Sequence, residues 1–181
     1  RSRGLGDVYK RQGTTYEELG ASEVAFHLRE RGDTTGIGGQ VPRLEDPERQ
    51  LEVYRKLSSS IQNGLIRTAH DCSEGGLATA LAEMCIGGRC GAIIDIDGIG
   101  NGDVFSRLWS ESLGRIIVSV EAEHELAFVE IMEGADIHLI GMVTESSDLI
   151  VEDGYDTVFH SDIDDLTHSW KGSLDMTGAV E

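Results

Sequence analysis

Residues 67–84, RTAHDCSEGGLATALAEM, combine a short apolar run, a polar turn and an amphipathic run. Two glycines, Gly75 and Gly76, lie where a helix would begin, and the turn before them contains Asp71 and Ser73. The first backbone N–H groups of a helix have no partner within it, and the helix dipole is positive at that end. Such a terminus binds anions, and glycines let a ligand approach the backbone closely. The segment is therefore a candidate site for a phosphate-bearing ligand.

The same turn carries negative charge through Asp71 and Glu74, and this charge would repel a bare phosphate. A Mg²⁺ ion between turn and phosphate would remove the conflict, since carboxylate oxygens are suitable ligands for Mg²⁺. The simpler interpretation is that Ser73 or Asp71 caps the helix while the glycines let it pack closely on a sheet. Because such caps are common, the residues alone favour capping, and a nucleotide or metal site is the alternative.

Helix and strand signals on both sides of the turn indicate how it is positioned. Periodic apolar residues predict helices at residues 15–31, 47–63, 76–86, 103–109, 121–133 and 162–170. Short β-branched runs predict strands at residues 65–70, 90–97, 114–120, 137–144 and 148–153. Thr15 and Asp46 are the candidate N-caps of the first two helices, although Gly20 interrupts the first of them. Interspersed helices and strands predict an α+β, layered domain.

Composition limits the classes of function. A chain of 181 residues matches one domain, and its formal net charge of −18 disfavours binding to nucleic acid or to an anionic membrane. Three cysteines without CxxC spacing, Cys72, Cys85 and Cys90, favour buried free thiols in a reducing cytoplasm. No run has the length of a membrane span, and no signal peptide is evident. We therefore expect a cytoplasmic protein with neither a nucleic-acid nor a membrane partner.

Residues 1–12, RSRGLGDVYKRQ, differ in composition from the rest of the chain. They carry four basic residues and one acidic residue, against an excess of acidic residues elsewhere. They resemble translated adapter read-through, which occurs at the ends of reading frames assembled from environmental sequencing. We expect an artefact or a disordered arm here, with a genuine basic arm as the alternative. Residues 13–181 are expected to form a single α+β domain, the last domain of a larger protein.

Four blocks of the sequence, YEELGASE, AHDCSEGGLATALAEM, GAIIDID and LWSESLGRIIVSV, occur in an order and spacing that is similar to a known family. They resemble the last domain of formylglycinamidine ribonucleotide synthetase, also called phosphoribosylformylglycinamidine synthase. Aminoimidazole ribonucleotide synthetase, selenophosphate synthetase, thiamine monophosphate kinase and the hydrogenase maturation factor share the domain but carry other residues in the HD-x-S-x-GG turn. The resemblance implies a fold like the C-terminal domain of aminoimidazole ribonucleotide synthetase-like ATP-binding enzymes.

The resemblance also implies a reaction. The family converts formylglycinamide ribonucleotide, ATP and ammonia from glutamine into formylglycinamidine ribonucleotide, ADP and phosphate. ATP activates the amide oxygen of the substrate for attack by ammonia, and Mg²⁺ neutralises the phosphates. The catalytic histidines and main ATP-binding residues of the family precede this domain, so the resemblance implies no catalytic residue here and an isolated chain that is inactive. The implied partners are the upstream ATP-binding domains and a glutaminase, fused or separate.

Carried over residue by residue, the resemblance implies two site segments. The first is a nucleotide or metal turn, in which Asp71 takes the place of a Mg²⁺ ligand; its candidate residues are Asp71, Ser73, Gly75 and Gly76. The second is a substrate loop made of Ser110, Glu111 and Ser112. Leu113 stands where the family has a glutamine, which removes an amide donor and acceptor.

Two other functions remain open at this stage. In many members of the family the second copy of this domain is degenerate. This chain is accordingly either part of the ligase's working machinery or a non-catalytic scaffold around an auxiliary nucleotide site. A related kinase or synthetase of the same superfamily is a further alternative, and the upstream sequence would distinguish it.

Overall fold

The computed structural model describes residues 8–12, 14–33 and 39–172. Within these residues seven strands form one sheet, in the order β2-β4-β1-β5-β3-β6-β7. The strands are β1 (Val8–Gln12), β2 (Thr68–Asp71), β3 (Gly91–Asp95), β4 (Ile116–Val120), β5 (Ile137–Thr144), β6 (Asp148–Asp153) and β7 (Asp156–Asp162). Neighbouring strands are antiparallel except β3 and β6, which are parallel. The turn after β2 therefore lies at one edge of the sheet.

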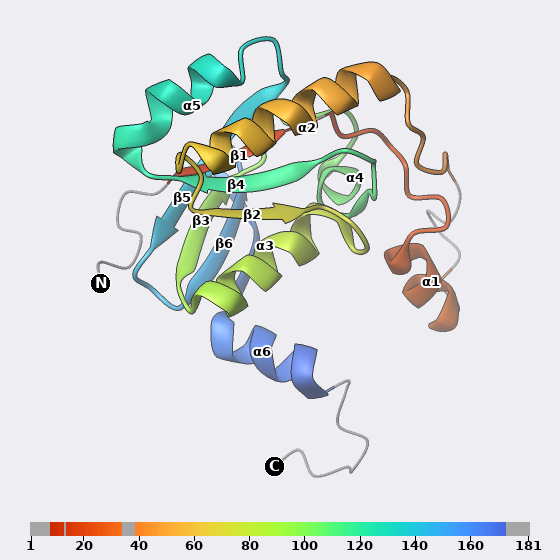
Figure 1. Ribbon diagram of the computed structural model, residues 1–181. Helices are drawn as coiled ribbons and strands as arrows, with labels where there is room; N and C mark the ends of the chain where they lie inside the picture. The colour runs from red at the N-terminus through yellow and green to blue at the C-terminus, as the bar shows by residue number, and fades with distance from the viewer. Residues whose placement is uncertain (1–7, 13, 34–38, 173–181) are drawn as a thin grey trace.

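Helices cover both faces of this sheet. They are α1 (Glu23–Glu30), α2 (Pro47–Gln62), α3 (Gly76–Gly88), α4 (Val104–Trp109), α5 (Glu125–Ile131) and α6 (Ile163–Gly172), with a 3₁₀ turn η1 (Ala122–His124). Figure 1 shows α2 and α5 over one face, α3 and α6 over the other, and α1 set apart at one end. This layered arrangement confirms the predicted α+β class.

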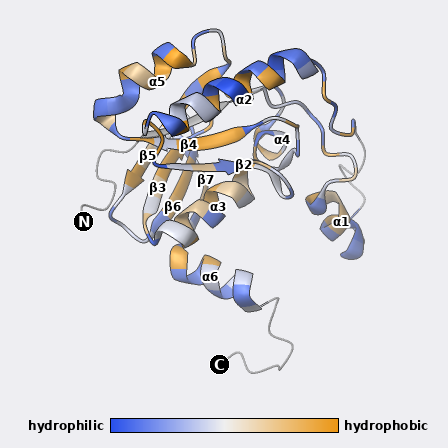
Figure 2. Ribbon diagram, viewed as in Figure 1, coloured by the Kyte–Doolittle hydropathy of each residue, from blue (hydrophilic) through white to orange (hydrophobic). Residues whose placement is uncertain are grey.

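Strand β4 contributes to a hydrophobic core on each side. Its five residues are all buried, and successive side chains point to opposite faces. Ile117 belongs to the cluster that α3 closes with Leu77 and Leu81. Val118 belongs to the second cluster, which α5 closes with Phe128. Figure 2 shows the corresponding contrast between the hydrophobic β4 and helix α2, which carries hydrophilic and hydrophobic residues in turn.

Two predicted helix starts are confirmed by their cap hydrogen bonds. The carboxylate of Asp46 accepts from the backbone N–H of Arg49 at 2.9 Å, with Pro47 at the first helical position. The carboxylate of Asp103 accepts from the N–H of Ser106 at 2.8 Å. Hydrogen bonding to Ser106 lowers the pKa of Asp103. Both caps satisfy N–H groups that lack a partner within the helix.

The helix predicted to start at Thr15 starts later. Ser22 is the N-cap, α1 begins at Glu23, and Thr15 is fully buried. The reason is that the preceding backbone is bonded elsewhere. The N–H groups of Tyr16 and Glu18 donate to serine hydroxyls of a distant loop, at 3.1 and 3.3 Å.

Val8–Gln12, part of the segment expected to be an artefact or a disordered arm, is a strand of the sheet. This segment is β1, which pairs antiparallel with β4 on one side and with β5 on the other. The physical reason is that β4 and β5 each expose backbone donors and acceptors toward the gap between them, and an extended segment satisfies both sets. Residues 1–7 lie outside the described residues, and so does the end of the chain from residue 173.

The cysteines form no disulfide, as predicted. Cys72 and Cys85 are buried as expected, whereas Cys90 is only half-buried. Burial raises the pKa of the Cys85 thiol to about 12, so that it stays protonated at neutral pH. Among the helices of the described residues, none combines the length and apolar character needed to span a bilayer.

Candidate functional site

Asp71 stands at the end of the edge strand β2 with its side chain 70% exposed. The hydroxyl of Ser73 donates a hydrogen bond to its carboxylate. This hydrogen bond, and less strongly the nearby ring of His70, hold the pKa of Asp71 below its usual range. The carboxylate is therefore ionised and accessible at neutral pH, as a ligand for a hard cation must be.

His70 itself ties the strand to the helix that follows. Its Nε2 lies 3.0 Å from the carboxylate of Glu83 on α3, and its Nδ1 lies 2.7 Å from the backbone oxygen of Asp71. Both ring nitrogens are thus engaged by groups of the fold. This geometry gives His70 a structural role in joining β2 to α3.

The two glycines of the turn are required by backbone conformation and by space. Gly75 and Gly76 have φ angles of 73° and 64°, in the left-handed region that other residues rarely adopt. A Cβ on Gly76 would lie 2.8 Å from the carbonyl oxygen of Leu108 and closer still to that of Ser110. The start of α3 therefore packs directly against the backbone that follows α4.

The prediction that Ser73 or Asp71 caps α3 is wrong. No side chain caps this helix from the N-cap position, which Gly75 occupies. The hydroxyl of Ser73 is bonded to Asp71 instead, and the N–H of Gly75 donates to the carboxylate of Glu111 at 2.8 Å. The acceptor at the start of the helix thus comes from another part of the chain.

The predicted substrate loop is held by backbone contacts. Ser110 and Ser112 are completely buried, and their hydroxyls accept from the N–H groups of Glu18 and Tyr16. Glu111 between them is half-buried, and its Oε1 accepts from the N–H of Glu23 at 2.9 Å as well as from Gly75. A contact between this loop and a substrate stays a prediction, and in this structure its two serines make buried structural bonds.

Sequence reasoning missed the buried charges beneath the loop. Arg115 is 1% exposed, and its guanidinium donates to the backbone oxygens of Ser110 and Ser112 and to Thr15 Oγ1. Burial lowers the pKa of Arg115, although an arginine stays charged. Glu18 is 3% exposed and contributes a negative charge nearby. Arginine is almost never fully buried unless its charge is paired, so the residue type of Arg115 predicted an exposed side chain. Its position directly after the SESLG run was the one local sign of a role in the loop.

These residues surround one pocket. A cavity of about 560 Å³ is lined by residues that include Asp71, Ser73, Glu74, Glu111 and Arg115. Three carboxylates against one guanidinium make its polar lining negative. This donor set fits Mg²⁺, which proteins usually hold through one or two carboxylates together with phosphate oxygens and waters.

The other predicted residues lie around this pocket rather than in its wall. Gly75 lines an adjacent groove of about 720 Å³, and Glu74 belongs to both linings. Gly76 packs against the backbone after α4, and the serines of the loop lie behind Glu111. The structure thus places Asp71, Ser73 and Glu111 in the lining of one pocket, where Ser73 and Asp71 are bonded to each other, and the other predicted residues lie beside it.

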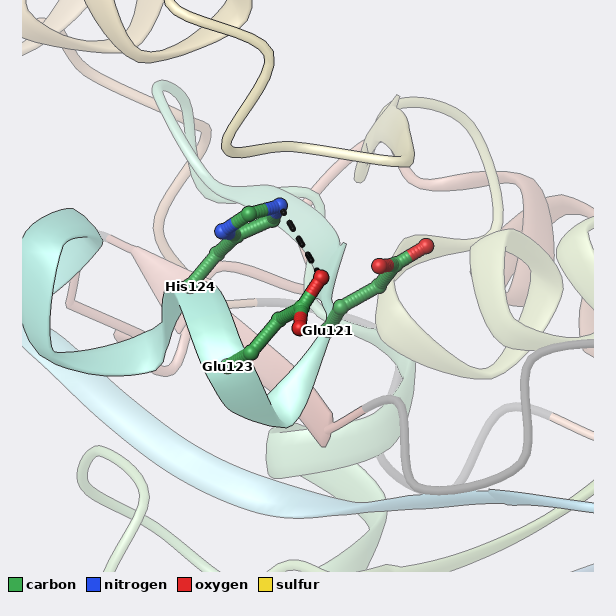
Figure 3. Close-up of side chains that lie close together, drawn as sticks. All are labelled: Glu121, Glu123 and His124. Atoms are coloured by element: carbon green, nitrogen blue, oxygen red, sulfur yellow. Dashed lines mark ion pairs between the residues drawn. The ribbon is translucent and has the colours of Figure 1, made fainter.

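A second acidic group lies elsewhere, after strand β4. Figure 3 shows Glu121, Glu123 and His124, whose ligand atoms lie within 4.8 Å of one another. The carboxylate of Glu121 already binds Arg67 at 2.6 Å, and His124 pairs with Glu123 at 3.8 Å. We assign no metal site here, because acidic groups gather on exposed surfaces without one.

Comparisons with known proteins agree with this fold. The family model described as AIR synthase related protein, C-terminal domain, matches residues 17–154. T. maritima PurL complexed with FGAR superposes with a TM-score of 0.72 at 21% identity, over 91% of this chain and 28% of that one. T. maritima PurL complexed with ATP gives 0.70 at 21% identity, over 92% and 26%. PurLQS from the same organism gives 0.68 at 22% identity, over 90% and 26%.

At these identities the solved structures show a shared fold, and the chain spans about a quarter of the length of these relatives. The family model, by contrast, covers most of the chain, including both the turn and the Ser110–Ser112 loop. The chain therefore belongs to the AIR synthase related protein family, as its C-terminal domain.

Proposed function

We propose that this chain is the C-terminal domain of a phosphoribosylformylglycinamidine synthase, an ATP-dependent C–N ligase of purine biosynthesis. Membership of the AIR synthase related family and the fold shared with T. maritima PurL support this proposal. The HD-x-S-x-GG turn favours the synthase over the superfamily's kinases. The observation that carries it is the pocket that Asp71, Ser73 and Glu111 line beside the start of α3.

In this proposal the turn takes part in binding nucleotide. Asp71 would hold Mg²⁺, and Ser73 would keep its carboxylate ionised and oriented. When bound, Mg²⁺ neutralises charge on the phosphates during phosphoryl transfer. Glu74 at the mouth of the pocket favours a cation over a bare anion. No residue of this chain is assigned to the bond-making step, so catalytic groups come from elsewhere in the protein.

The activity belongs to a larger assembly. The chain spans about a quarter of the PurL structures, so we propose that upstream ATP-binding domains complete the site and that the chain alone is inactive. The structure described as PurLQS supports a glutaminase partner that delivers ammonia. Mg²⁺, ATP and a cytoplasmic location complete the proposal.

One specific observation favours a second function, that of a scaffold. Most of the predicted site residues already have structural partners: Gly76 packs on backbone, the two loop serines hold the segment before α1, and Glu111 binds two amides. A domain that only assembles its neighbours, around a nucleotide that is never turned over, would need the same contacts. Asp71 distinguishes the two, because its carboxylate is exposed and its hydrogen bond comes from Ser73 within the same turn.

The test uses the complete protein that contains this chain, assayed for ADP formation with formylglycinamide ribonucleotide, ATP and ammonia. If the turn holds the working Mg²⁺, Asp71→Asn should lower turnover about a hundredfold or more, equivalent to about 2.7 kcal/mol of lost transition-state stabilisation. Asp156→Asn, on the far edge strand β7, is the matched control and should leave turnover unchanged. Turnover preserved in both variants would support the scaffold, and no activity with this substrate in the unmodified protein would reject the synthase.

A further inference from the structure

One oxygen of Glu111 joins two helix starts. Its Oε1 accepts from the N–H of Glu23, the first residue of α1, at 2.9 Å. The same atom accepts from the N–H of Gly75, immediately before α3, at 2.8 Å. Both N–H groups belong to helix termini that offer them no partner within the helix. The carboxylate therefore connects α1 to the Asp71–Gly76 turn.

The backbone of Glu111 is fixed on both sides. Ser110 and Ser112 are completely buried, and their hydroxyls bind backbone N–H groups of the segment before α1. The guanidinium of Arg115 donates to the carbonyl oxygens of both serines. A side chain that projects from such a loop has a defined origin, so it can set the distance between the two helix starts.

The two elements that it joins line the same groove. Figure 1 shows α1 apart from the helical layers that cover the sheet. The groove of about 720 Å³ beside the turn has Glu23 of α1 in one wall and Gly75 in the other. Glu111, which lines the neighbouring pocket, thus connects two segments that border one groove, and a displacement of α1 would be transmitted to the turn through its carboxylate.

We propose that Glu111 is a positioning residue that couples α1 to the Asp71–Gly76 turn, so that the placement of α1 controls the affinity of the turn for its ligand. The identity of that ligand, Mg²⁺ with a nucleoside diphosphate, rests on the proposed function. The coupling itself rests on the two amide hydrogen bonds. Its contribution to the site is indirect, through the turn, and the carboxylate does not need to touch the ligand.

Two substitutions separate this role from direct ligation of a cation. Glu111→Gln keeps a carbonyl oxygen that can accept from both amides but removes the negative charge. Glu111→Ala removes the acceptor oxygen as well as the negative charge. A positioning residue tolerates Gln and not Ala, whereas a cation ligand is impaired by both substitutions. Where the Ala variant does not fold, Glu111→Asp replaces it, because the shorter side chain cannot reach both amides.

The first measurement is hydrogen exchange of individual backbone amides in the full chain, followed by NMR. Glu111→Ala should accelerate exchange at both Glu23 and Gly75 about tenfold, since each loses its acceptor. Glu111→Gln should keep both rates near those of the unmodified chain. Asp103→Ala is the matched control: it removes a carboxylate that accepts from the start of another helix, and it should accelerate exchange at Ser106 alone. Acceleration at Gly75 without Glu23, or equal effects of Gln and Ala, would overturn the coupling.

The second measurement is calorimetric titration of ADP with Mg²⁺ into the same proteins. The proposal expects Glu111→Ala to weaken binding about tenfold, and Glu111→Gln to restore it to within about threefold. Equal weakening by both substitutions would overturn the positioning role in favour of direct ligation. If the unmodified chain binds no ADP with Mg²⁺, the nucleotide site fails for the isolated chain, and the exchange rates decide the coupling by themselves.

Discussion

Arg115 is the residue on which the loop beside the turn depends most. Its side chain is 1% exposed and donates to Ser112 O at 3.1 Å, to Thr15 Oγ1 at 3.3 Å and to Ser110 O. Burying a guanidinium costs free energy, and hydrogen bonds offset that cost only while every acceptor stays in place. Because Thr15 is 100 residues away along the chain, this one side chain fixes two distant segments against each other.

A lysine at position 115 should not reproduce the hydrogen bonds of the arginine. The ammonium of Arg115→Lys lacks the planar fork that reaches three acceptors, so we expect the free energy of unfolding to fall by about 2–4 kcal/mol. Urea denaturation followed by circular dichroism measures this change. Arg89→Lys is the control, since Arg89 is exposed and pairs with Asp164 at 3.0 Å, and it should change stability by less than about 1 kcal/mol. Similar small losses in both variants would contradict the role of Arg115.

Individual site residues were predictable to the extent that their signal is local. Asp71 and Ser73 lie two positions apart in one turn, so their types and spacing alone marked the turn as a helix cap, with a cation or nucleotide site as the alternative. Glu111 entered through a family resemblance, and its partners at Glu23 and Gly75 could not be foreseen. Arg115 was missed for the same reason, because its acceptors become neighbours only after the fold forms.

At the scale of elements, the start of α3 is tightly constrained. Gly76 combines a φ of 64° with backbone oxygens of Leu108 and Ser110 where a Cβ would stand. Helix α3 in turn supplies Leu77 and Leu81 to the larger core cluster. The turn that carries Asp71 and the core beneath it are therefore fixed by the same close approach of two backbones.

A single methyl group tests this constraint. Gly76→Ala should lower the free energy of unfolding by about 2–5 kcal/mol, because the left-handed conformation and the crowded Cβ both oppose it. Gly87→Ala is a matched control in the same helix, where a Cβ meets nothing within 4 Å. That control should stabilise the chain by at most about 1 kcal/mol, since alanine has a higher helix propensity than glycine and Gly87 lies in the last turn of α3. Thermal unfolding compares the two, and an unchanged midpoint for Gly76→Ala would argue against tight packing at the turn.

Elements with strong local signals matched their predictions. The predicted strands at residues 137–144 and 148–153 coincide with β5 and β6, and Asp46 and Asp103 start α2 and α4. Strand β7 was missed because Asp156–Asp162 is largely polar, as an exposed edge strand can be. The start of α1 was misplaced because long-range hydrogen bonds took the backbone groups that a helix would have used.

At the scale of the whole molecule, β1 joins two parts of the sheet. Strands β2 and β4 lie on one side of it, and β5, β3, β6 and β7 lie on the other. A β-ladder is made of backbone groups, so an extended segment free of proline can fill such a position whatever its side chains. The pairing of Val8–Gln12 shows where this segment lies in the fold, but it does not bear on its origin. The adapter-like origin of residues 1–12 stays a prediction.

Removing this strand should affect the molecule as a whole. A chain that begins at Gly13 leaves β4 and β5 without a partner along five paired positions each. Since an intramolecular hydrogen bond contributes about 1 kcal/mol and a domain is stable by only about 5–15 kcal/mol, we expect cooperative urea unfolding to be lost. A chain that begins at Val8 is the control, and the difference between the two reports on β1 alone.

Hydrogen exchange adds a spatial readout to that comparison. Loss of β1 should raise exchange first in β4 and β5, and then in the Asp71–Gly76 turn, because β2 pairs only with β4 in the described sheet. Unchanged exchange in β4 and β5 would mean that these strands find another partner without Val8–Gln12. The turn proposed to bind a cation would then be supported independently of the first strand. Simultaneous loss at β4 and at the turn would instead make the pairing of β1 a condition for the site.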